Sequence, residues 1–226
     1  MLAHLETTEN EGKERIAILG ASASAASTVL TEVGAVSSPR LVLVGPGIVA
    51  SDSAAKAAVT LPPPYLAAMV AGKLATVAPH VSLTNKTLPV DDLDQHYNTS
   101  TYKNLLQNRV FLVRQKFGFQ VVKGISTDTG AFKQISIRRI VDYAKAGVRS
   151  GADPYIGRLN NARVRGALKA TLDGFLSQMV QDEMLVKYEL DVSATRAQEI
   201  NGICVVVMTL MPTFSIDFIR VTMNLQ

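Results

Sequence analysis

Basic side chains gather in one stretch of this 226-residue chain, from Lys133 to Lys169, where only two carboxylates, Asp142 and Asp153, oppose them. Guanidinium and ammonium groups bind phosphates or the carboxylates of another protein. Three interpretations stay open: a solvated face, a nucleic-acid-binding module with few aromatic rings for stacking, and a face that meets an acidic surface on another subunit. The candidate charged contacts are Arg138, Arg149, Arg163, Arg165 and Lys169.

Catalytic residues do not form a recognised motif. The glycine-containing turns match neither a dinucleotide fingerprint nor a P-loop, and there is no nucleophile elbow or zinc-protease motif. The three histidines, His4, His80 and His96, lack metal-ligand spacing. Cys204 lies in the apolar run "ICVVVM", which indicates a small buried hydrophobe. The sequence therefore indicates no catalytic, cofactor or metal site, and an α/β enzyme with an unrecognised site remains the alternative.

Composition is that of a globular protein, with 47% hydrophobic and 19% charged residues and a net charge of +4. A single cysteine excludes an internal disulfide framework. No signal peptide is visible, and the apolar stretch "PYLAAMVAGKLATVAP" is too short to span a bilayer. These features predict a soluble protein made in the cytoplasm. The amino-terminal residues that could supply an acidic surface are Glu6, Glu9, Glu11 and Glu14.

Apolar runs at 15–21 and 39–47 predict two strands, and the segment between them can form a helix. This β-α-β pattern predicts a mostly parallel sheet core covered by helices. Residues 48–60 are expected to be irregular, a helix should follow the prolines at 62–64, and Gln115–Gly118 should be the turn of a hairpin.

From residue 131 the pattern changes. Helical spacing of apolar residues predicts two amphipathic helices, at 131–151 and 160–184. Strand-like runs follow at 186–192 and 203–211. The sequence thus predicts an α+β carboxyl-terminal part with two helices and an antiparallel sheet.

The last residues, "MPTFSIDFIRVTMNLQ", alternate between apolar and polar, as a strand does, but the phase slips between Phe218 and Ile219. Such a slip turns the other face of a strand towards the core. Either a bulge corrects it within one sheet, or the strand passes into a second packing environment.

Several stretches, in this order, resemble contractile phage tail sheath proteins. They are "GKERIAILGA", "RLVLVGPG", "LPPPYLAAMVAGKLATVAPHVSLTNKTL", "GISTDTGAFKQISIRRIVDYAKAGVR" and "PTFSIDFIRVTMNL". The resemblance implies a structural protein without enzyme activity or cofactor. It implies a core domain of subtilisin-like topology at 1–123 and a C-terminal domain at 124–226. Family members carry an N-terminal region ahead of the helix that opens this chain, so the resemblance implies that this region is missing here.

The family's role implies partners and a location. Subunits would form stacked rings around a tail tube protein in the virion tail, with baseplate and tail terminator proteins at the ends, after assembly in the host cytoplasm. No nucleic acid or membrane insertion is implied. Arg163, Arg165 and Lys169 are alternatively candidates for contact with the tube.

The family's terminal arms add strands to the sheets of neighbouring subunits, which suggests a role for the last segment. We hypothesise that it pairs with another copy, and a bulged strand inside one subunit remains the alternative. The candidate inter-subunit residues are Ile216, Phe218, Ile219, Val221, Met223 and Leu225.

Overall fold

The computed structural model describes residues 1–52, 54 and 56–223. The chain divides into two compact units. The first contains residues 1–138 and the terminal segment from Ser215, and the second contains residues 139–214. The boundary falls inside helix α5 (Ile135–Ala152). Within the described ranges, no helix combines the length and apolar character needed to cross a bilayer.

The first unit is built around a five-stranded sheet in the order β1-β2-β7-β8-β5. β1, β2 and β7 run parallel, and β8 is antiparallel to both β7 and β5. Helix α2 (Ala26–Gly34) connects β1 to β2, so the predicted β-α-β core is confirmed. β7 and β8 form the predicted hairpin. The strands are β1 (Ala17–Gly20), β2 (Leu41–Gly45), β5 (Thr87–Leu88), β7 (Phe111–Gln115) and β8 (Phe119–Val121).

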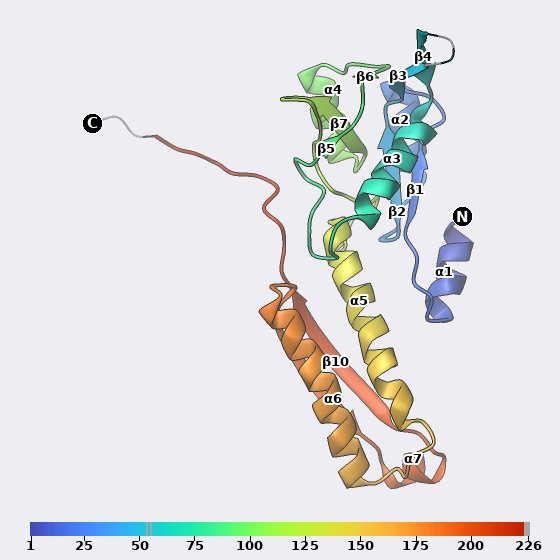
Figure 1. The fold of residues 1–226 in the computed structure, drawn as a ribbon, viewed down its shortest axis with the longest axis vertical. Helices are drawn as coiled ribbons and strands as arrows, with labels where there is room; N and C mark the ends of the chain where they lie inside the picture. The colour runs from blue at the N-terminus through green and yellow to red at the C-terminus, as the bar shows by residue number, and fades with distance from the viewer. Residues whose placement is uncertain (53, 55, 224–226) are drawn as a thin grey trace. The chain divides into compact units, whose positions relative to one another are not determined.

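Helices pack on both faces of this sheet (Figure 1). Val44 of β2 packs with Leu66 of α3. Leu43 points to the opposite face and packs with Val29 of α2 and Leu105 of α4. A parallel strand buried on both faces needs apolar residues at successive positions, which explains the unbroken run at β2. Two of these covering helices are α3 (Pro63–Ala75) and α4 (Thr99–Gln107).

The start of α3 lies directly against the end of β1. A Cβ atom added at Gly20 would lie 2.2 Å from the backbone nitrogen of Pro64 and 2.3 Å from the carbonyl carbon of Pro63. Two backbones can approach this closely only where one of them carries no side chain. Gly20 therefore sets the distance between α3 and the sheet.

A second, antiparallel sheet in this unit has the order β4-β3-β6. Its first two strands form a hairpin across residues 48–61, so the expectation of irregular structure at 48–60 was wrong. Alanine and serine have weak strand preference, so the strands are not evident from the local sequence; β3 pairs with β4 on one side and with β6 on the other. The strands are β3 (Ile48–Asp52), β4 (Ala57–Leu61) and β6 (Asp92–Leu93).

The amino-terminal helix α1 (Leu2–Asn10) carries Glu9 to two buried guanidinium groups. Arg40 Nε donates to Glu9 Oε2 at 2.7 Å, and Arg138 Nη2 to Glu9 Oε1 at 3.4 Å. The side chains of Arg40 and Arg138 are 3% and 6% exposed. Buried cations need such a partner, because an unpaired buried charge is strongly destabilising. Glu9, which was a candidate for an acidic surface facing another subunit, thus pairs with basic residues of its own chain.

The second unit contains most of α5, followed by helices and a two-stranded antiparallel sheet of β9 and β10. The predicted apolar stripes are confirmed: Ile140, Ala144 and Val148 of α5 are buried. Leu172 and Leu176 of α6 are also buried. The elements are η1 (Asp153–Tyr155), α6 (Ala162–Gln181), β9 (Leu185–Ser193), α7 (Arg196–Ile200) and β10 (Val205–Pro212). Together with the core, they confirm the predicted fold class.

Candidate assembly interface

Beyond β10 the chain continues as an extended segment, and residues 213–223 form no helix or strand (Figure 1). A strand was predicted from Ile216, but none of the described strands pairs with this segment, so its backbone completes no ladder. Leu225 lies outside the described residues. A contiguous set of exposed apolar side chains marks an interaction surface. The exposed fractions are 77% for Ile216, 77% for Phe218, 75% for Ile219, 75% for Val221 and 87% for Met223.

The beginning of this segment, residues 215–217, is called its root. It is held in the first unit by a group of hydrogen bonds and one ion pair, which we call the clamp. Gln134 Nε2 donates to the carbonyl oxygen of Ser215 at 3.0 Å, and the backbone N–H of Ser215 donates back to Gln134 Oε1 at 3.1 Å. Asp217 accepts from Gln134 Nε2 at 2.7 Å and from Thr84 Oγ1 at 3.1 Å. Lys123 Nζ lies 3.4 Å from the same carboxylate. The clamp fixes where the segment leaves the subunit, whereas the residues after Asp217 are exposed.

We expect Gln134→Ala to release the root. It removes both bonds to the Ser215 backbone and one to Asp217, each contributing about 0.5–1.5 kcal/mol. Hydrogen exchange at the Ser215 amide should become at least about tenfold faster, while the rest of the first unit keeps its protection. Gln107→Ala is the matched control. Gln107 lines a hollow that surrounds the root and makes no hydrogen bond to the segment. Equal exchange in the two variants would contradict the clamp.

A hollow of about 890 Å³ surrounds the root, and residues 216–219 form part of its wall. Among the described residues that line it, Asp217 is the only carboxylate. Arg109 is held by the carbonyl oxygen of Thr127 at 2.6 Å, and Arg114 Nε is buried without a hydrogen-bond partner. The excess of positive charge favours an acidic partner at this place. The cations that line the hollow are Arg109, Arg114, Lys116, Lys123 and Lys133.

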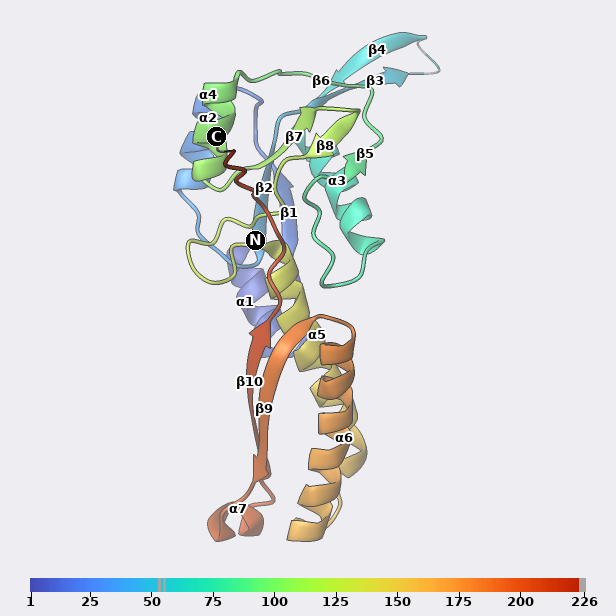
Figure 2. The ribbon, with the colours of Figure 1, turned by 90° about the vertical axis from the view of Figure 1, so that its left-hand side faces the viewer.

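The second unit offers a sheet to which a strand could be added. β9 and β10 pair only with each other among the described strands, so each has one unpaired edge. α6 packs against β9 (Figure 2). Tyr188 of β9 donates a hydrogen bond to Asp173 Oδ1 of α6 at 2.7 Å. Unpaired N–H and C=O groups along a strand edge are a template for another strand. The sheet is therefore a possible acceptor of an extended segment.

The predicted charged contacts are divided between the two units. Arg138 is buried against Glu9 and lies over the Phe132 ring at 4.7 Å, so it is an internal residue of the first unit. This corrects its interpretation as a surface contact, because pairing with Glu9 removes it from solvent. In the second unit, Arg149, Arg163 and Lys169 are exposed on α5 and α6.

Arg165 is half-buried beside α7. Its Nη1 donates to Glu199 Oε1 at 2.8 Å and to Asn160 Oδ1 at 2.9 Å. The hydrogen bonds from Arg165 and then Arg196 hold the pKa of Glu199 below its usual value. Arg165 therefore ties α7 to the start of α6.

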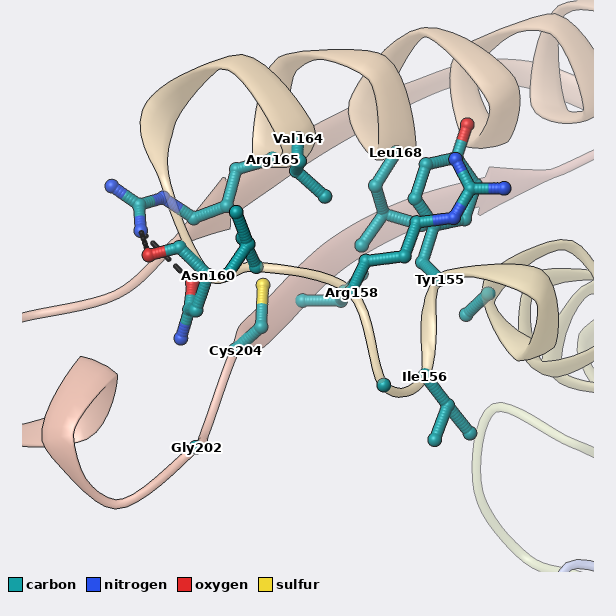
Figure 3. A pocket seen from close by; sticks show the side chains of 13 residues that line it. Tyr155, Ile156, Arg158, Asn160, Val164, Arg165, Leu168, Gly202 and Cys204 are labelled. Atoms are coloured by element: carbon teal, nitrogen blue, oxygen red, sulfur yellow. Dashed lines mark hydrogen bonds between the residues drawn. The ribbon is translucent and has the colours of Figure 1, made fainter.

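A second hollow of about 310 Å³ lies beside Arg165, between the start of α6 and β10 (Figure 3). Cys204 lines it and is exposed, so the expectation of a buried cysteine was wrong. Cys204 lies just before β10, which begins at Val205, on a connection that is exposed from Asn201 to Cys204.

The carboxyl ends of the parallel strands, where ligands bind in many α/β folds, are closed by internal contacts. Ser24 Oγ donates to Asp94 and accepts from the Gly47 N–H at 3.0 Å, and Tyr97 donates to the Ser24 carbonyl at 2.5 Å. Burial, followed by the nearby Asp94 charge, raises the pKa of Tyr97. Among the described residues, no group of three or more His, Cys, Asp or Glu side chains could hold a metal ion.

The clamp was not anticipated from the sequence, whereas the antiparallel sheet of β9 and β10 was predicted, although not as an acceptor. Gln134 and Asp217 are 83 positions apart, and no local pattern signals their contact. Asp217 was interpreted only as a polar position in an alternating strand.

Comparisons with known proteins bear on this geometry. A family model described as phage tail sheath C-terminal domain matches residues 127–226. The sequence finds no match among curated proteins.

Several solved structures share the fold. A chain of the anti-feeding prophage baseplate matches with a TM-score of 0.79 and 16% identity, over 98% of this chain and 63% of that one. A chain of the PVC sheath complex, an extracellular contractile injection system in the contracted state, matches with a TM-score of 0.80 and 15% identity, over 97% and 67%. The sheath tail protein of Desulfitobacterium hafniense matches with a TM-score of 0.69 and 18% identity, over 93% and 52%.

The chain thus spans about half to two thirds of the length of these proteins. The family match and the shared fold agree with the order of motifs along the sequence. Residues 127–226 are therefore similar to the phage tail sheath C-terminal domain, and the resemblance of the chain to contractile tail sheath proteins is confirmed.

Proposed function

We propose that this chain is a structural subunit of a contractile sheath, which polymerises helically around a tail tube and contracts to drive the tube through a host envelope. Its main partner is another copy of itself. The tube protein, baseplate and tail terminator proteins are its further partners in the virion tail, following assembly in the host cytoplasm. Its role is structural, without catalysis or a cofactor. Residues 1–123 act as the sheath core domain and 124–226 as the C-terminal domain.

One observation carries the proposal. The exposed apolar segment from Phe218 to Met223 has no strand partner among the described residues, and the second unit has a two-stranded sheet with unpaired edges. Adding the segment of one copy to the sheet of another would satisfy backbone N–H and C=O groups on both. It would also remove the apolar side chains from water.

The geometry of such a link supports an open assembly. A segment of one copy that enters a sheet of the next makes a head-to-tail contact, which continues as a helix when it does not close into a ring. The clamp at Gln134 fixes the outgoing end of the link. Strand pairing then keeps neighbours joined while the rigid units repack.

Contraction would be a change between two packings of these linked units. A free-energy difference of a few kcal/mol per subunit between the two packings, typical of switching proteins, becomes large when summed over many subunits. The energy is stored in subunit packing, so no nucleotide is required. Remade charged contacts are candidates for the change: the basic hollow at the segment's root, and Arg149, Arg163, Arg165 and Lys169 against another subunit or the tube.

Negative-stain electron microscopy of the purified full chain tests the proposal. We expect rings or tubes with a regular repeat. A small closed oligomer at all concentrations would contradict it and would favour the enzyme alternative. Tight DNA binding that is lost steeply with salt, without any ordered particle, would favour the nucleic-acid-binding alternative.

A further inference from the structure

The extended segment carries one cation, Arg220, between two apolar residues. Arg220 is exposed and makes no ion pair with the described residues. Its neighbours Ile219 and Val221 point to the opposite side of an extended backbone. A strand with this pattern needs an acceptor whose one face is apolar and whose other face carries a carboxylate. This inference rests on the proposed strand exchange.

The β9 edge has both properties. Leu190 and Val192 lie on the half-buried face of β9 together with Tyr188, which bonds to α6. Glu189 and Asp191 are exposed on the other face, two residues apart, without an ion pair to the described residues.

The β10 edge lacks the second property. The register of the sheet places Thr209 opposite Glu189 and Val207 opposite Asp191, so the same outer face of β10 is uncharged. Val207 is 55% exposed there. A strand added at β10 would set Arg220 beside apolar or hydroxyl groups, with no carboxylate directly opposite. The other described edge strands β1, β4 and β5 contain no acidic residue. β6 contains Asp92 but is only two residues long, too short to pair with the whole segment.

We propose that Arg220 is a specificity-determining residue: it directs the terminal segment to the β9 edge of a neighbouring copy by pairing with Glu189 or Asp191. Aligning Ile219, Val221 and Met223 with the apolar face of β9 fixes the register to one of two choices. In a parallel pair, Arg220 lies opposite Glu189. In an antiparallel pair, it lies opposite Asp191. Directly opposite residues of unlike charge stabilise a strand pair, and residues of like charge destabilise it.

Charge reversal in the full chain tests the proposal, with assembly followed by light scattering and sedimentation. Arg220→Glu should raise the concentration needed for assembly by about ten- to thirtyfold, because an attraction becomes a repulsion. Lys103→Glu, an equal change of charge on exposed α4, is the matched control and should have much less effect. Arg220→Glu combined with Glu189→Arg should recover assembly if the strands are parallel. Combined with Asp191→Arg, it should recover assembly if they are antiparallel.

Recovery by one of these swaps supports the proposal and reports the strand direction. Absence of recovery by both, or an Arg220→Glu variant that assembles like the unchanged protein, would overturn it. Deletion of residues 219–226 separates this outcome from the proposed function. If the deletion abolishes assembly while Arg220→Glu does not, strand exchange stands and only the role of Arg220 is lost. If the deleted chain still assembles, the strand exchange itself is refuted.

Discussion

Deletion of residues 219–226 is expected to leave a folded, soluble monomer that no longer assembles. The deleted part includes Ile219, Val221 and Met223, which are 75%, 75% and 87% exposed and contribute nothing to the core of the chain. Burying one such side chain stabilises a complex by about 1.5–3 kcal/mol, from which the cost of ordering the backbone is subtracted. A net loss of about 3 kcal/mol weakens association more than a hundredfold.

The measurement is sedimentation velocity combined with circular dichroism. The deleted chain should keep the spectrum and melting temperature of the full chain and should sediment as a single small species at every concentration. A pair of point variants provides the matched control. Val221→Asn should reproduce most of the defect, because it places an amide on the apolar side of the strand. Thr222→Asn changes the polar side and should assemble nearly normally. Equal behaviour of these two variants would argue against an alternating strand.

Gly20→Ala is expected to destabilise the first unit by about 3 kcal/mol or more. The added Cβ would lie 2.2 Å from the Pro64 nitrogen and 2.3 Å from the Pro63 carbonyl carbon. These are backbone atoms, so no side-chain rotation can relieve the clash. Helix α3 would have to move away from β1, which would loosen the core around Leu66 and Val70. Overpacking commonly costs about 1–3 kcal/mol, and a backbone obstacle places this site at the upper end.

Thermal denaturation measures this effect, and a fall in melting temperature of about 6–12 °C is expected for a chain of this size. Gly72→Ala, in the helix α3 that Gly20 contacts, is the matched control. A Cβ at Gly72 meets no atom within 4 Å, and alanine is favoured over glycine inside a helix by about 0.5–1 kcal/mol. That variant should melt at the same or a higher temperature. A Gly20→Ala protein as stable as Gly72→Ala would contradict the close approach of α3 to the sheet.

Local patterns in the sequence determined the elements and their order. The apolar run of β2 predicted a strand buried on both faces, and Val44 and Leu43 indeed pack on opposite sides. The helical spacing in α5 and α6 predicted the buried stripes, because periodicity alone specifies which face of a helix meets the core. The order of motifs along the chain was sufficient to indicate contractile tail sheath proteins.

Contacts between distant residues were decided only by the tertiary structure. Gln134 and Asp217 meet across 83 positions, and Arg138 is removed from the surface by Glu9, 129 positions away. Residues 48–61 form a hairpin whose β3 strand also pairs with β6, and Cys204 is exposed on the connection before β10.

The sequence by itself thus determined the main helices, the strands of the parallel core and the apolar character of the terminal segment, since these follow from periodicity over a few neighbouring residues. It did not determine the β3–β4 hairpin, and the strand that it predicted from Ile216 is not formed within the described part of the chain. The tertiary structure decided which side chains are buried, how the terminal segment is anchored and that its strand partner is not among the described strands. Those properties depend on which distant backbones and charges come together, and no local pattern encodes that.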